Sequence, residues 1–225
     1  MNFAEREKFL FSVLSQISGN IDFVVIGGYA INAYVLPRFS IDCDVVVRNK
    51  KDSQKLQKLL KTIGFLERAN GKLAPYTGEF VSMASKEPAA TFDILSGAVE
   101  DRLSGTIFPA ELIFKNSSKR AIFGKGSPMQ LSCRVVDAEL LFLMKACPAR
   151  STDIRDLFML SSMKLDGKKI EKIAKEINAK IDSVKILAKI NSRDFLNALQ
   201  GVHGKLPAEQ YEKTLGKARK NIEKL

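Results

Sequence analysis

Hydrophobic positions at the start of the chain follow helical and then strand spacing. Apolar residues recur every three or four positions over residues 3–18, which predicts an amphipathic helix. A short apolar run over 22–26 predicts a buried strand, and Gly27-Gly28 ends that strand. Helical spacing then resumes over 29–35, up to Pro37. The chain therefore opens with a helix, a strand and a second, short helix.

Strict alternation follows from Ile41 to Val47. Asp42, Asp44 and Val46 fall on one face of the predicted strand, and the residues between them fall on the other. Further along, the pattern predicts a helix over 52–62 and strands over 64–68, 79–84 and 91–95.

The pattern changes again after residue 107. Residues 107–136 are rich in Gly, Ser and β-forming residues, which predicts short strands and turns. Gly124 to Ser127 lacks the spacing of a phosphate-binding loop and is interpreted as a hairpin turn. Beyond Asp137 six segments have helical spacing: 138–146, 153–163, 168–177, 183–190, 193–200 and 208–222. We therefore expect a mixed α/β (α+β) domain over 1–135 and a helical domain over 136–225.

Composition narrows the class of protein. The 225 residues are 45% hydrophobic and 27% charged, as in ordinary globular domains. No apolar stretch reaches the ~18–20 residues that cross a bilayer, and the N-terminus lacks an apolar signal core. Three widely spaced cysteines support neither a disulfide framework nor a zinc site. We expect a cytoplasmic protein with reduced thiols and no membrane partner.

Net charge is +11, and the excess is uneven. Residues 164–225 hold 15 Lys and Arg against 8 Asp and Glu. Such an excess favours polyanionic partners, either nucleotide phosphates or an RNA such as tRNA. The alternative is a lysine-rich solvated helical surface.

The clearest chemical signal is the carboxylate pair Asp42 and Asp44. In a strand these side chains point the same way, about 6.5–7 Å apart. Two carboxylates at that spacing repel each other unless a cation lies between them, and oxygen ligands suit Mg²⁺, with Mn²⁺ as a second candidate. Gly27 and Gly28, at a strand end and helix start, would let phosphate oxygens reach backbone N–H groups. Each feature also has a plain structural interpretation, as a solvent-facing strand edge or an ordinary turn.

Asp93 supplies a third carboxylate. It lies in the run TFDIL, and a carboxylate among apolar residues is costly unless it is paired or metal-bound. If its strand lies beside that of Asp42 and Asp44, three carboxylates can hold two metal ions. The alternative is that Asp93 only caps or pairs.

The segment VVIGGYAINAYVLPRFSIDCDVVV resembles the signature of the DNA polymerase β-like nucleotidyltransferase superfamily. It is most similar to the branch of abortive-infection toxins and antibiotic-modifying nucleotidyltransferases. The resemblance implies that Asp42, Asp44 and Asp93 are catalytic metal ligands, with Asp93 as general base. It also implies that four residues bind the NTP: Gly27, Gly28, Arg38 and Ser40.

A second segment, LMKACPARSTDIRDLFML, resembles a helical motif of the same family. The resemblance implies that Lys145 binds the triphosphate. It also implies that Arg150, Asp153 and Asp156 help to position the acceptor, or that the aspartates position Lys145. Thr152 stands where the family has a Lys, and Pro148 interrupts the motif. An interhelical ion-pair cluster is the alternative interpretation.

The resemblance implies a metal-dependent enzyme that moves a nucleoside monophosphate from an NTP to an acceptor. The acceptor is open: an RNA or tRNA end, a protein hydroxyl or a small molecule. Two alternatives remain, a non-catalytic nucleotide- or RNA-binding module and a toxin held in check by an antitoxin protein. The match covers about residues 20–100 and 135–160, and the last ~60 residues match no motif.

Overall fold

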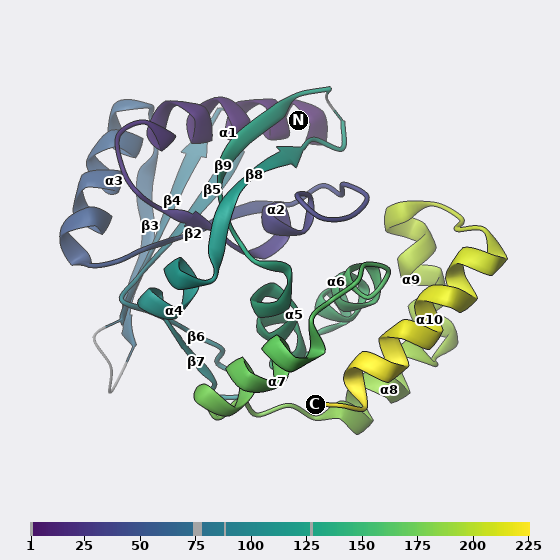
Figure 1. Cartoon of the computed structure of the whole chain (residues 1–225). Coiled ribbons are helices and arrows are strands. Elements are labelled where there is room, and N and C mark those ends of the chain that lie inside the picture. The colour runs from purple at the N-terminus through teal and green to yellow at the C-terminus, as the bar shows by residue number, and fades with distance from the viewer. Residues whose placement is uncertain (1, 74–77, 88, 127) are drawn as a thin grey trace. The chain divides into compact units, whose positions relative to one another are not determined.

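Two compact units make up the chain in a computed structural model that describes residues 2–73, 78–87, 89–126 and 128–225 (Figure 1). The first unit comprises Met1–Ala33, Pro37–Val99 and Phe108–Asp137. The second comprises Tyr34–Leu36, Glu100–Ile107 and Ala138–Leu225.

A seven-stranded mixed sheet forms the core of the first unit. Its strands are β1 (Val24–Val25), β2 (Asp42–Val47), β3 (Leu66–Leu73), β4 (Gly78–Lys86), β5 (Ala89–Ser96), β8 (Ser117–Phe123) and β9 (Gln130–Val136). Their order across the sheet is β3-β4-β5-β2-β1-β9-β8. β2 is central, antiparallel to β1 and parallel to β5.

Among its described residues, this unit has four helices: α1 (Phe3–Ser18), α2 (Gly27–Ile31), α3 (Lys50–Thr62) and α4 (Ala110–Lys115). α1 and α3 pack against each other and against the sheet. Phe92 of β5 makes an edge contact with Phe65, which stacks on Phe9 of α1. Because side chains alternate along a strand, the face of β5 that holds Asp93 points away from α1.

The second unit contains α5 (Ala138–Ala146), α6 (Ser151–Leu160), α7 (Gly167–Glu176), α8 (Ser183–Ile190), α9 (Arg193–His203) and α10 (Ala208–Ile222). α6 is the centre of this bundle and contacts α5, α8, α9 and α10. Phe158 of α6 packs on Phe195 and Tyr211 with ring centroids 5.3 and 5.2 Å apart. The short strands β6 (Ala98–Glu100) and β7 (Ile107–Pro109), most of whose residues belong to the first unit, pair with each other.

The predicted fold class is confirmed: a mixed α/β (α+β) sheet structure is followed by helices. The chain over 107–136 departs from the predicted strands and turns, because it includes α4. The apolar run Leu112 to Phe114 is buried in that helix, where its β-forming residues had favoured a strand. All three cysteines are buried free thiols.

Candidate active site

Three aspartates lie on one face of neighbouring strands. In the parallel pairing of β2 with β5, Asp44 is directly opposite Asp93, and Asp42 is opposite Thr91. Neighbouring strands are about 4.8 Å apart. The strand of Asp93 therefore lies beside the strand of Asp42 and Asp44, as a site with three carboxylates requires. The three aspartates are on the face of the sheet turned away from α1.

A serine from the next strand fixes the orientation of Asp93. Ser82 of β4 pairs across the sheet with Asp93, and its hydroxyl donates a 2.7 Å hydrogen bond to Oδ1 of that carboxylate. Burial raises the pKa of Asp93, and the negative charge of Asp42 raises it further. The Ser82 hydrogen bond and the positive charge of Arg68 oppose this rise in pKa. Asp93 is thus a more basic carboxylate than an exposed aspartate.

Gly27 lies against the carboxylate of Asp44. Its φ of +64° is in the left-handed region that favours glycine. A Cβ at this position would overlap the Asp44 carboxylate and lie 2.8 Å from its Cγ. The turn between β1 and α2 therefore brings backbone directly beside the aspartate row, and a side chain would prevent this approach.

Gly28 makes the same kind of approach to the segment before β2. A Cβ there would lie 2.9 Å from Cβ of Ser40 and 3.2 Å from Nη2 of Arg38. The structure therefore brings together five of the residues that the sequence singled out: Gly27, Gly28, Arg38, Ser40 and Asp44.

Two residues that the sequence analysis did not identify hold this segment in place. The amide of Asn32, fully buried, donates to the carbonyl oxygen of Arg38 at 2.9 Å and accepts from its N–H at 3.0 Å. The hydroxyl of Tyr29 donates to the carbonyl oxygen of Ser40 at 3.4 Å. Burial raises the pKa of Tyr29, with smaller contributions from Cys43 and Glu7, so the phenol stays a neutral donor. One signal in the sequence could have identified Asn32: it is a polar residue inside the largely apolar stretch 29–35.

The donor set at the aspartate row fits a hard divalent cation. Asp42, Asp44 and Asp93 offer only carboxylate oxygens, and their like charges repel across one face. In the part of the chain that the structure describes, no three His, Cys, Asp or Glu side chains gather closely enough to hold a metal ion in the arrangement shown. The strand register places the three carboxylates on one face, and a metal site there stays a prediction.

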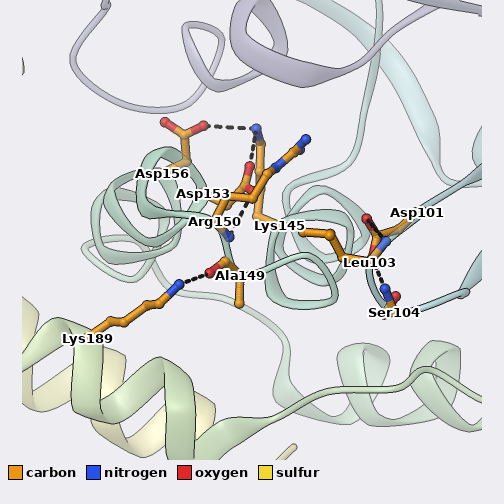
Figure 2. Close-up of polar contacts among 9 residues, drawn as sticks. All are labelled: Asp101, Leu103, Ser104, Lys145, Ala149, Arg150, Asp153, Asp156 and Lys189. Carbon is orange, nitrogen blue, oxygen red and sulfur yellow. Dashed lines mark hydrogen bonds and ion pairs between the residues drawn. The ribbon is translucent and has the colours of Figure 1, made fainter.

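The second predicted group lies in the second unit, where α5 and α6 meet (Figure 2). Nζ of Lys145 is 3.1 Å from Asp153 and 3.0 Å from Asp156. Nε of Arg150 donates to Asp153 at 2.6 Å, and the Arg150 backbone N–H donates to the same carboxylate at 3.2 Å. The four residues are therefore together, as an interhelical ion cluster. Their roles in triphosphate binding or acceptor positioning stay predictions.

The turn between α5 and α6 is strained and is tied to a third helix. Ala149 has φ +46°, and its carbonyl oxygen accepts a 2.6 Å hydrogen bond from Nζ of Lys189 in α8 (Figure 2). This contact holds the turn that presents Arg150 to Asp153.

Comparison with protein families gives a match over almost the whole chain. The family described as "Nucleotidyl transferase AbiEii toxin, Type IV TA system" matches residues 8–224. No curated protein sequence matches the chain.

Similar folds occur among solved structures. The chain is similar to a candidate nucleotidyltransferase from H. pylori, with TM-score 0.52, 15% identity, and coverage of 100% of this chain and 96% of the other. It is also similar to JHP933 from Helicobacter pylori, with TM-score 0.53, 15% identity, and coverage of 99% and 92%. A third similar structure is ANT(2″)-Ia in complex with adenylyl-2″-tobramycin, with TM-score 0.52, 14% identity, and coverage of 77% and 97%. At these identities the comparison shows a shared fold.

Proposed function

The chain belongs to the AbiEii family of nucleotidyltransferase toxins, and we propose that it transfers a nucleoside monophosphate from an NTP to a hydroxyl group of an acceptor. The acceptor oxygen would attack the α-phosphorus and form a new P–O bond. The bond from that phosphorus to the bridging oxygen would break, and pyrophosphate would leave. The observation that carries the proposal is Asp93 directly opposite Asp44, with Gly27 against the Asp44 carboxylate.

The glycine turn and its neighbours would bind the triphosphate. Gly27 and Gly28 bring the backbone at the start of α2 close to Asp44, Arg38 and Ser40, and its N–H groups would donate to phosphate oxygens. The guanidinium of Arg38 and the hydroxyl of Ser40 lie against Gly28 and would add charged and neutral donors. The triphosphate-binding role that the family resemblance implies for Lys145, in the second unit, stays a prediction.

Asp42, Asp44 and Asp93 would hold Mg²⁺, or Mn²⁺, which when bound would polarise the phosphates and lower the pKa of the acceptor hydroxyl. Asp93 would take the acceptor's proton. Ser82 binds its Oδ1, so we assign proton acceptance to Oδ2.

RNA, including tRNA, is the acceptor class that the charge distribution favours. The basic excess of residues 164–225 would attract a polyanion to the second unit. Arg150, Asp153 and Asp156 are the candidates for positioning the acceptor. If the acceptor is a protein hydroxyl or a small molecule, the label-transfer experiment below will give a different result.

The family description refers to type IV toxin–antitoxin systems, which suggests an antitoxin partner for this chain. We therefore expect transfer activity to limit growth of the host cell unless that partner is present. No helix among the described residues combines the length and apolar character that a membrane span needs.

Label transfer from the four α-³²P-labelled NTPs tests the proposal. Each would be incubated with the protein, Mg²⁺, and total cellular RNA or total protein. We expect label on RNA from one or more NTPs with wild type, and no label with Asp44→Asn or Asp93→Asn. Asp52→Asn, in α3 of the same unit, is the matched control and should transfer as wild type does.

Two other outcomes would change the conclusion. Label on protein, or on no macromolecule despite pyrophosphate release, would replace RNA with a protein or small-molecule acceptor. No transfer by wild type, together with equal NTP binding by wild type and Asp44→Asn, would favour the non-catalytic binding module.

A further inference from the structure

We infer that Glu7, in α1, is a positioning residue that holds the Arg38–Ser40 segment against the Gly27-Gly28 turn. The inference rests on the proposed function, because it concerns the same triphosphate site. Glu7 lies outside every motif that the sequence analysis singled out. Its role follows from contacts that join three distant parts of the chain.

Glu7 is a buried charge with a specific hydrogen-bonding task. Its side chain belongs to a residue that is 1% exposed, and within the first unit it is the one charged residue among the buried residues that the structure describes. Oε1 accepts from the backbone N–H of Lys125 and Oε2 from that of Gly126, both at 2.9 Å. Burying a carboxylate is costly unless such bonds compensate for lost water. Glu7 therefore fixes the turn between β8 and β9.

That turn packs directly on the segment before β2. A Cβ at Gly126 would lie 2.8 Å from Cζ of Phe39 and 2.8 Å from Cβ of Ala4, so only glycine allows this approach. Phe39 also stacks on Phe3 of α1, with ring centroids 5.4 Å apart. Phe39 thus packs between α1 and the turn whose backbone N–H groups bind Glu7.

Phe39 connects this packing to the triphosphate site. It lies between Arg38 and Ser40 in sequence, and both of their side chains lie against Gly28. The backbone N–H of Phe123, at the end of β8, also donates to the carbonyl oxygen of Asn32 at 3.3 Å. Asn32 in turn binds the Arg38 backbone. Loosening the turn would therefore release the donors that we place around the triphosphate.

Glu7→Gln tests the inference, because glutamine keeps the shape but can accept only one of the two hydrogen bonds. Glu5→Gln, at an exposed glutamate of the same helix, is the matched control. NTP affinity would be measured by calorimetry with Mg²⁺ and the NTP that gives most label transfer. We expect Glu7→Gln to weaken binding about tenfold, the effect of losing one charge-assisted hydrogen bond. The fall in kcat/KM should exceed that in kcat, and Glu5→Gln should change neither.

Amide hydrogen exchange gives a readout that needs no nucleotide. Glu7→Gln should speed exchange at residues 38–40 as well as at 124–126, whereas Glu5→Gln should not. Faster exchange confined to 124–126 would show that the Glu7 hydrogen bonds hold only the turn and not residues 38–40, and the inference would be wrong.

Two further variants test the path through Phe39. Gly126→Ala keeps Glu7 but pushes on Phe39, so it should weaken NTP binding and speed exchange at 38–40 in the same way, even if Glu7→Gln does not fold. Phe39→Ala should weaken NTP binding. The double variant Glu7→Gln/Phe39→Ala should bind NTP no more weakly than the weaker-binding single variant, because both changes act through one contact. Additive losses would contradict the path.

The failure of this inference is distinguishable from that of the proposed function. If wild type binds and transfers while Glu7→Gln matches Glu5→Gln, the inference alone is wrong. If wild type binds no NTP, the proposed function falls and this inference falls with it.

Discussion

Each unit brings aspartates together, but the two groups differ in their electrostatics. In the second unit Asp153 and Asp156 are 1% and 0% exposed, and Lys145 and Arg150 balance their charge at 2.6–3.1 Å. In the first unit Asp42, Asp44 and Asp93 are less deeply buried and place like charges on one face of the sheet.

The carboxylates of the two units therefore differ in their roles. A cluster with balanced charges in the interior holds helices together, and removing one partner leaves the other uncompensated. A row of like charges beside a glycine turn costs stability in the free protein and gains it when a cation arrives. Substitutions in the second unit should therefore cost much stability, whereas substitutions in the aspartate row should cost little.

The largest effect should follow Asp44→Asn. We expect transfer to fall by about a thousandfold, as when a group that stabilises transition-state charge is removed. The melting temperature should change little, because asparagine keeps the shape of the side chain and removes one negative charge beside Asp42 and Asp93. Single-turnover label transfer and calorimetry on the same preparation would measure both quantities. A large fall in melting temperature would mean that Asp44 serves folding instead.

Asp156→Asn should give the converse result. It leaves the ammonium of Lys145 buried with less compensation, which typically costs about 3 kcal/mol or more of unfolding free energy. Urea denaturation would measure this loss. Glu171→Gln is the control: Glu171 and Lys175 form a 2.7 Å ion pair, but both side chains are exposed, so stability should hardly change. Equal losses in the two variants would contradict a stabilising role of the buried ion cluster.

Gly27→Ala should reduce both stability and activity. The new Cβ would meet Asp44, and alanine disfavours φ +64°. Gly64→Ala is the matched control, since Gly64 has φ +97° and a Cβ added there would meet no described atom within 4 Å. Both variants should lose roughly 1–3 kcal/mol of stability from backbone strain. Only Gly27→Ala should also lose kcat/KM, by about 10- to 100-fold, because it displaces the aspartate row.

Ligand binding should raise the stability of wild type. Mg²⁺ with NTP at about 100 times its Kd should add roughly 2.7 kcal/mol to the unfolding free energy, a rise of several degrees in melting temperature. Asp42→Ala should abolish the gain, whereas Asp156→Asn should keep it if the protein remains folded. A thermal shift assay with and without Mg²⁺ would separate these outcomes. Retention of the gain in Asp42→Ala would contradict a metal site at the row.

The sequence predicted elements best where local spacing alone decides them. The structure has helices at residues 3–18, 138–146, 183–190 and 208–222, as predicted. The helix α4 was missed because its apolar residues are consecutive, which periodicity cannot assign to helix or strand.

The site residues also divide into those that local spacing predicts and those that only long-range packing reveals. Asp42, Asp44, Gly27 and Gly28 lie within one short segment, so their spacing could be read from the chain. Ser82 and Glu7 could not be found in this way, since their importance arises from strand register and from packing across more than 100 residues. Long-range hydrogen bonds carry no local sequence pattern.

Calorimetric titration of NTP into wild type and Asp44→Asn, each with and without Mg²⁺, tests whether the aspartate row holds a cation that binds the NTP. We predict that Mg²⁺ strengthens NTP binding to wild type by at least about tenfold and has no such effect on Asp44→Asn. Equal Mg²⁺ dependence in the two proteins would contradict a cation held by the aspartate row.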